Sequence, residues 1–172
     1  MEWVGRFATN IDRLSAVVGR TVAWLTVTIV IVTVYDVLVR YLFKAGSILI
    51  QEVEWHLFSA NFLLAASWVV QLNGHVRVDL FHSRMHPKQK AWVDLLGGIF
   101  FLVPFCAVIV WASIPFVYDS WAIWEGSSDP GGLPARYLLK TVMAVAYILM
   151  GLQGVSQIIK NFLILRSKEI ES

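Results

Sequence analysis

Charged residues are scarce in this chain, and their scarcity limits what kind of protein it can be. Asp, Glu, Lys and Arg make up 15% of the 172 residues, whereas a typical soluble domain has about 25%. Hydrophobic residues make up 58%, and the mean hydropathy is +0.66. These values indicate a membrane protein, and the length leaves no room for a large water-soluble domain.

Cysteine is nearly absent, since Cys106 is the only one. A single thiol excludes an internal disulfide and a zinc site with several cysteine ligands. Cys106 lies in an apolar run, so we expect it to pack as a small hydrophobic residue. The net charge is only +2, and the Lys and Arg residues are dispersed. We therefore expect no nucleic-acid partner.

Catalytic motifs are missing as well. The sequence has no G-x-S-x-G, P-loop or H-E-x-x-H motif, so we expect no enzyme activity. No A-x-A-like cleavage site follows the first apolar run. We therefore expect this run to be a retained span and not a signal peptide.

Four uncharged apolar segments are present, and a bilayer core needs about 20 helical residues to be crossed. The first reaches that length only if it continues past Asp36, and the second only if it begins near Glu52. A lone strand cannot satisfy its backbone in lipid, so we expect helices. The segments are Thr21–Tyr35, Leu57–Leu72, Leu95–Tyr118 and Thr141–Ile159.

The predicted fold is an all-α membrane protein with four transmembrane helices and a short amphipathic cytoplasmic connector. Ten of the 14 Lys and Arg residues fall in the N-terminal segment, the connector and the C-terminal end, so both termini are expected in the cytoplasm. Pro104 is expected to kink the third span, and Pro115 to mark its end. The predicted boundaries are an N-terminal segment 1–20, spans 21–41, 48–72, 92–118 and 137–161, periplasmic loops 42–47 and 119–136, a connector 73–91, and a tail 162–172.

Ionisable residues inside spans are costly and are functional candidates by default. Asp36 and Arg40, spaced i and i+4, are expected to pair at the outer end of the first span. The pair either ends the span or contacts a partner. Glu52, Glu54 and His56 open the second span. Glu52 and Glu54 either line its first turns, where the helix dipole favours acids, or contact a partner. His56 lies about one turn deeper and either packs, contacts a partner, or has a role in proton or ion coupling.

Further polar residues lie near the ends of the third and fourth spans. Asp94 opens the third span and Lys140 the fourth, and both are expected in the headgroup region, Lys140 by snorkelling. Gln153 and Gln157, at i and i+4, either hydrogen-bond across helices or line a wet inner end of the span.

The connector holds His75, Asp79, His82 and His86, which would share one face of a helix. Such spacing is a weak metal signal, because the neighbouring "HVRVDL" alternates with period two and equally fits an extended segment. Bis-histidine haem ligation is not expected, because only His56 is embedded. The favoured interpretation is a connector whose cations meet anionic headgroups, and no role is assigned to His82 or His86.

Three stretches of the sequence occur together in a characteristic order and spacing. They are "VLVRYLFKAGSILIQEVEWHLFSANFLLAASWVVQLNGHVRVDLF", "VDLLGGIFFLVPF" and "DPGGLPARYLLKTVM". Through them, the chain resembles over about residues 15–162 the small membrane subunit (Q subunit, DctQ type) of TRAP transporters, the tripartite ATP-independent periplasmic transporters.

The resemblance implies a protein of the bacterial inner membrane that holds the large membrane subunit (M subunit). It would also help the periplasmic substrate-binding protein (P subunit) to dock during sodium-driven uptake of an organic acid. The substrate and sodium sites would belong to the large subunit, so no cofactor, metal ligand or catalytic residue is expected here. Candidate docking residues on the periplasmic loop are Trp121, Trp124, Glu125, Asp129 and Arg136, although this loop could also be a plain connection.

Two other hypotheses remain at this point. One is a small membrane cytochrome or oxidoreductase subunit. The other is a self-assembling small transporter in which Asp36, Glu52 and His56 would line a path.

Overall fold

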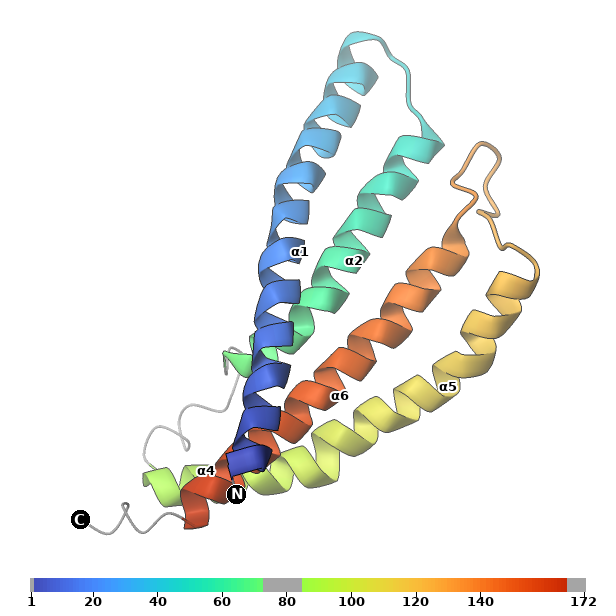
Figure 1. Ribbon diagram of the computed structural model, residues 1–172. Helices are drawn as coiled ribbons and strands as arrows, with labels where there is room; N and C mark the ends of the chain where they lie inside the picture. Colours follow the sequence, from blue (N-terminus) through green and yellow to red (C-terminus); the bar gives the residue numbers. More distant parts are fainter. Residues whose placement is uncertain (1, 73–84, 167–172) are drawn as a thin grey trace.

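The computed structural model describes residues 2–72 and 85–166, and these residues form helices joined by short loops. No strand occurs within these two ranges, which agrees with the all-α prediction. Figure 1 shows long helices that run alternately up and down in a splayed bundle. The helices are α1 (Glu2–Leu42), α2 (Ile48–Gln71), α4 (Pro87–Gly97), the π-helical turn η1 (Gly98–Leu102), α5 (Val103–Ala122) and α6 (Arg136–Arg166).

Three helical stretches of the described chain are long and apolar enough to cross a membrane. They are Trp3–Leu42, Pro87–Ala122 and Arg136–Arg166. The helix α2, which matches the second predicted span, is not among them. It carries Glu52, Glu54 and His56 near its start, and these residues lower its mean hydropathy.

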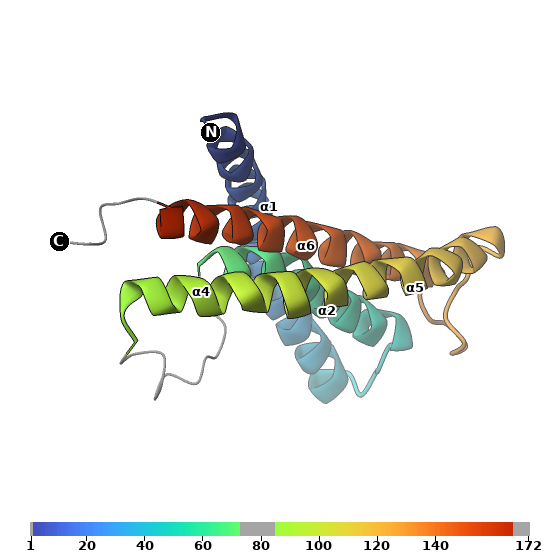
Figure 2. The ribbon, with the colours of Figure 1, turned by 90° about the horizontal axis from the view of Figure 1, so that it is seen from below.

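The helix α1 begins far earlier than the first predicted span. It runs without a break from Glu2, so the N-terminal segment before residue 21 continues the same helix. At about 1.5 Å per residue, its 41 residues extend roughly 60 Å, whereas the hydrocarbon core is about 30 Å thick. The first half of α1 also crosses α6 obliquely, as the view from below shows (Figure 2).

Pro104 coincides with a change of helical register in the third predicted span. The Val103 N–H bonds to the carbonyl of Gly98, five residues back, which is the π-helical pattern of η1. A proline has no N–H and its ring pushes away the carbonyl four residues back, which here is Phe100 inside η1. Figure 1 shows the chain bending between α4 and α5. The helix α5 continues past Pro115 to Ala122, so this proline does not end the helix, and its place at the end of the membrane span stays a prediction.

Small residues let the helices approach closely, as is typical of helix packing in membranes. A Cβ atom added to Gly19 would lie 2.5 Å from Trp68 of α2, and one on Gly154 would lie 2.9 Å from Leu102. Cys106 is buried against Gly151, so its predicted packing role is confirmed. Large apolar side chains are mostly on the outside of the bundle, where lipid or another subunit can cover them.

The connector is described only from residue 85 onward, so His75, Asp79 and His82 lie outside the described residues. His86 precedes α4, where its side chain and that of Gln89 form a reciprocal capping box with the backbone. Its N–H donates to Gln89 Oε1 over 3.0 Å. Within residues 2–72 and 85–166, no group of three or more His, Cys, Asp or Glu side chains could hold a metal ion.

Candidate functional site

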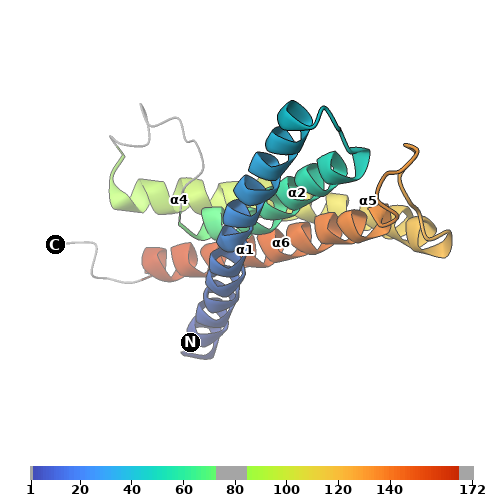
Figure 3. The ribbon, with the colours of Figure 1, turned by 90° about the horizontal axis from the view of Figure 1, so that it is seen from above.

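The loop between α5 and α6, residues 123–135, folds into a closed turn at the end of the bundle where α2 starts (Figures 1 and 3). The Ser127 N–H donates to the Leu133 carbonyl over 2.9 Å, and the Gly132 N–H to the Asp129 carbonyl over 3.0 Å. Gly131 has a φ of 81°, a conformation that glycine adopts without strain. The Asp-Pro-Gly-Gly sequence therefore builds a defined turn and not an open connection.

Glu52 of α2 anchors this loop, although it lies far away in the sequence. Its side chain is only 4% exposed. The Leu133 N–H donates to its Oε2 over 2.5 Å, and the Ser127 hydroxyl donates to its Oε1. Arg136 Nη2 lies 3.9 Å from the same Oε1. These charge-assisted contacts compensate the cost of burying the carboxylate, and we call this group of four residues the loop network.

Gly132 leaves the space that the loop network needs, because it has no side chain. A Cβ atom at this position would lie 2.8 Å from Glu52 Oε2 and 2.5 Å from the Ser127 Cβ. Both distances are too short for non-bonded atoms. The loop can therefore close over Glu52 only with glycine at this position.

A second ion pair joins the end of α5 to the start of α6. Lys140 Nζ donates to Glu125 Oε2, and the Ser120 hydroxyl donates to the same oxygen over 2.6 Å. The Lys140 ammonium also lies 4.0 Å from the centre of the Phe116 ring, a cation–π distance. The hydrogen bond from Lys140 holds the pKa of Glu125 below its ordinary value of 4.5, helped by the one from Ser120. Lys140 thus pairs within the protein, and its place in the headgroup region stays a prediction.

The aromatic residues of this region form one cluster. The ring centres of Trp121 and Trp124 lie 4.5 and 5.5 Å from that of Tyr137. The Trp121 indole N–H donates to Thr141 Oγ1 over 2.9 Å. Trp124 is 67% exposed, so the cluster fixes the orientation of a large outward-facing ring.

The candidate docking residues therefore divide into two groups. Trp124 and Asp129 point outward and are exposed. Glu125 and Arg136 are held in ion pairs inside the protein. Trp121 belongs to both groups, since it is 38% exposed and hydrogen-bonded.

Asp36 and Arg40 form the predicted pair on α1. The Asp36 side chain is 4% exposed, whereas that of Arg40 is 46% exposed. Within the described chain, Asp36 Oδ1, Glu54 Oε1 and His56 Nε2 are buried without a hydrogen-bond partner. The other ring nitrogen of His56 lies 2.6 Å from the Glu52 carbonyl oxygen. Buried polar atoms usually have partners, so these three are candidates for contacts with another subunit.

A second polar network, which the sequence did not predict, joins α1 to α6. Asp12 accepts hydrogen bonds from Gln153 and Ser156, each over 2.9 Å, and from Lys160. Ser15 donates to Gln153 Oε1 over 2.7 Å. Gln153 is fully buried, and its predicted hydrogen bonding across helices is confirmed. We call these five residues the α1–α6 network.

Two other predicted polar positions are also engaged. Gln157 donates to the Val70 carbonyl of α2 over 2.5 Å, which confirms the cross-helix alternative for it as well. Asp94 is half-buried near the end of α4.

Asp12 was not identified from the sequence as a network residue, because it stands among the arginines of the N-terminal segment. A signal for a buried helix face was nevertheless available in the sequence. It is the helical spacing of the small residues around Asp12, which are Ala8, Ser15 and Gly19.

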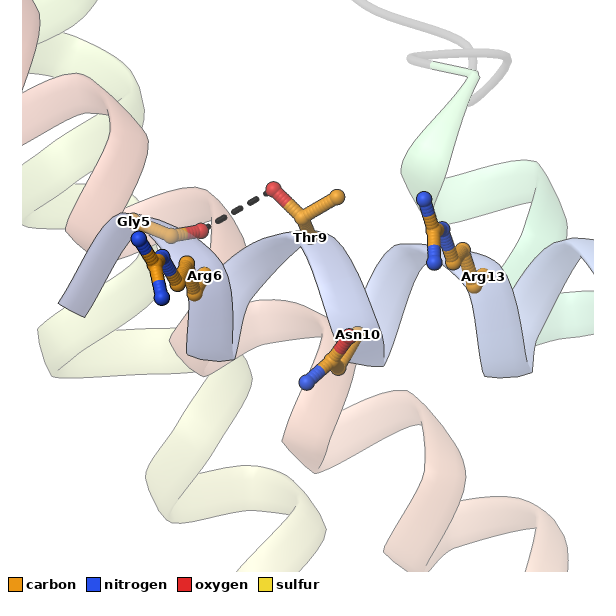
Figure 4. A pocket seen from close by; sticks show the side chains of 5 residues that line it. All are labelled: Gly5, Arg6, Thr9, Asn10 and Arg13. Atoms are coloured by element: carbon orange, nitrogen blue, oxygen red, sulfur yellow. Dashed lines mark hydrogen bonds between the residues drawn. The ribbon is translucent and has the colours of Figure 1, made fainter. Parts of the chain in front are cut away.

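A basic hollow of about 640 Å³ lies on the outer side of α1, near its start (Figure 4). Thr9 Oγ1 donates to the Gly5 carbonyl over 3.0 Å, which satisfies its hydroxyl within the helix. The lining comes from α1 alone and carries two arginines among neutral residues. The residues that line it are Gly5, Arg6, Thr9, Asn10 and Arg13.

The comparisons with known proteins agree with this architecture. A family model described as "Tripartite ATP-independent periplasmic transporters, DctQ component" matches residues 29–163. This range covers α2, the 123–135 loop and nearly all of α6. No curated protein and no solved structure matches the chain significantly. The family match covers well over half of the chain, which therefore belongs to the DctQ family, the small membrane subunits of TRAP transporters, and is a transporter component and not an enzyme.

Proposed function

We propose that this subunit holds the large membrane subunit in place and presents a preformed loop to the periplasmic substrate-binding protein. The transporter would use the sodium gradient to take up an organic acid. The observation that carries the docking role is the anchoring of the 123–135 loop by Glu52. A plain connection between two helices does not require a buried carboxylate from a third helix.

Pre-organisation supports docking on energetic grounds. A loop that is already ordered loses little conformational entropy when a partner binds. Its outward-facing Trp124 and Asp129 supply an aromatic anchor and a charge, and tryptophan is enriched among the residues that dominate binding energy. The rigid loop and its exposed side chains thus form a suitable contact surface.

The proposed topology has four spans, with both termini and the connector in the cytoplasm of a bacterium and the protein in its inner membrane. Three apolar helical stretches support it. The start of α1, the described part of the connector and the end of α6 lie at the same end of the bundle (Figure 1). These described segments carry seven Lys and Arg residues, whereas the opposite end of the bundle carries four, a bias in the direction that the positive-inside rule requires. In α2, the donors of the loop network and Arg136 compensate the charge of Glu52, which makes insertion of α2 into the membrane less costly.

The scaffold role is supported by the outer surface of the bundle. Exposed apolar side chains cover the long helices, and the unpartnered atoms of Asp36, Glu54 and His56 offer polar contacts. In the proposed complex, the sodium and substrate sites lie on the large subunit, and this chain needs no cofactor.

A transport assay in proteoliposomes tests the docking role. The membrane subunits are co-reconstituted, and uptake is measured while the binding protein is titrated. Glu52→Gln, which weakens the loop network, is expected to raise the binding-protein concentration needed for half-maximal uptake. Asp119→Asn, which removes an exposed carboxylate near the end of α5 and outside the loop network, is the control. Equal uptake curves for Glu52→Gln and the wild type, with a loosened loop, would exclude the docking role.

A second assay tests the scaffold role. Affinity purification of this chain is expected to recover the large subunit, and vesicles that contain this chain alone are expected to show no uptake. Full uptake by the chain alone would favour the self-assembling transporter instead.

A further inference from the structure

An apolar groove lies where α1, α4 and α6 meet, at the opposite end of the bundle from the loop network. Its volume is about 520 Å³, within the range of about 300–1,000 Å³ that is typical of ligand pockets. Its lining includes Val4, Leu95, Ile99, Ile158, Leu163 and Arg166.

The π-helical turn shapes one wall of this groove. Gly98 has no side chain, so Ile158 of α6 packs directly on the backbone there, 2.8 Å from where a Cβ atom would lie. Ile99, the next residue of η1, lines the groove. Turns of this kind inside helices are frequent at functional sites.

The chemistry of the groove is asymmetric. Among the residues that the structure describes, Arg166 is the one charged residue in the lining, and it belongs to the last turn of α6. It therefore lies at one end of the groove, about 12 Å along the helix from Ile158. Phe162, which also lines the groove, is 53% exposed, so the groove is open to the surroundings. Apolar walls with a cation at one end are complementary to an amphipathic anion.

We propose that this groove binds an acyl chain of an anionic phospholipid, whose phosphate contacts the Arg166 guanidinium. Two walls of the groove belong to the membrane-span candidates Pro87–Ala122 and Arg136–Arg166, and the groove lies at one end of them, where a lipid headgroup would meet the protein. Basic pockets between membrane helices bind anionic headgroups, and the guanidinium binds phosphate through paired hydrogen bonds.

A second groove provides an internal comparison. It lies between α5 and α6, has a volume of about 380 Å³, and is lined by residues such as Val103, Tyr147 and Leu152, with no charged residue. It can accept an acyl chain but has no group that selects a headgroup. Selection of anionic lipid is therefore expected at the first groove and not at the second.

Native mass spectrometry of the full chain, extracted from vesicles with equal phosphatidylglycerol and phosphatidylcholine of the same acyl chains, tests the proposal. The wild type is expected to retain phosphatidylglycerol preferentially. Arg166→Gln is expected to reduce this preference about fivefold, as loss of one cationic contact implies. Leu163→Trp, which fills the groove, is expected to reduce retention of both lipids.

Two matched variants separate the groove from general surface effects. Lys88→Gln removes an exposed cation of α4 outside the groove lining, and Leu152→Trp fills the uncharged groove. Both are expected to keep the wild-type preference. Circular dichroism and size-exclusion chromatography check folding, and if Leu163→Trp does not fold, the Arg166→Gln result decides alone.

Several outcomes would overturn the proposal. An unchanged preference in Arg166→Gln, or an equal loss in Lys88→Gln, would show that the groove does not select the headgroup. Displacement of the lipid by excess inorganic phosphate would show a simple anion site. Lipid retention that disappears only when the large subunit is bound would assign the groove to that subunit.

Discussion

Glu52 joins α2 to the 123–135 loop and to the adjoining start of α6, both distant from it in the sequence. Its carboxylate contacts Ser127 and Leu133 of the loop and lies near Arg136 at the start of α6. A buried carboxylate is stable only when such donors surround it. The position of the loop therefore depends on one side chain of α2, and substitutions around that side chain should have effects out of proportion to their size.

Gly132→Ala is expected to destabilise the protein by about 1–3 kcal/mol, as overpacking does. The added methyl group would collide with Ser127 and Glu52. Thermal unfolding in detergent measures the effect. Gly46→Ala is the control, because a Cβ atom there meets nothing within 4 Å. Equal stability of both variants would contradict the assigned contact.

The Glu125–Lys140 pair predicts a pH dependence. The hydrogen bond from Lys140 lowers the pKa of Glu125 below 4.5 in the folded protein. The stabilisation is therefore present above about pH 4.5 and is lost as the pH falls through the lowered pKa. The melting temperature of Glu125→Gln is expected to lie below that of the wild type at neutral pH and to converge with it in acid. A constant difference across this range would exclude the ion pair as the cause.

The helices owe their arrangement to small residues and to one proline. Gly19 lets Trp68 of α2 pack on the α1 backbone, and Gly154 does the same for Leu102. Pro104 follows the π-helical turn that bends the third predicted span. The helix positions thus depend on the absence of side chains or of an N–H group at defined points.

Two glycines of α1 offer a matched pair at this scale. Gly5→Ala is expected to stabilise the helix by about 0.5–1 kcal/mol, since alanine is the better helix former and the position is open. Gly19→Ala is expected to destabilise the protein by about 1–3 kcal/mol, because the methyl group would lie 2.5 Å from Trp68. Thermal unfolding of both variants gives the sign directly, and stabilisation by both would refute the α1–α2 contact.

At the scale of the whole molecule, the two ends of the bundle differ in construction. One end has the loop network and the aromatic cluster. The other has the α1–α6 network and the apolar groove that ends at Arg166. The proposed topology would give these two ends different surroundings, a periplasmic protein at the first and the cytoplasmic side at the second.

Cysteine labelling tests this orientation. Cys106 is the only native cysteine and is buried, so background labelling is expected to be low. Asp129→Cys should react with an impermeant thiol reagent on intact cells, and Lys90→Cys only after permeabilisation. The reverse pattern would invert the proposed topology.

Local sequence signals predicted the local features of the fold. The uncharged runs predicted helices, Pro104 predicted a bend, and the spacing of Asp36 and Arg40 predicted their pairing. The contacts of Glu52 could not be predicted, because its partner Leu133 lies 81 positions away. Likewise, nothing near Asp12 in the sequence identifies Gln153 as its partner.

The glycine at position 132 has a consequence for how relatives of this subunit can diversify. Any larger residue there would displace Glu52 or Ser127, so the inward side of the loop has little freedom to change. Trp124 and Asp129 face outward and can be exchanged without disturbing that interior. A lineage could thus adapt its loop to a new binding protein by replacing the outward residues alone, while the same anchor is inherited unchanged.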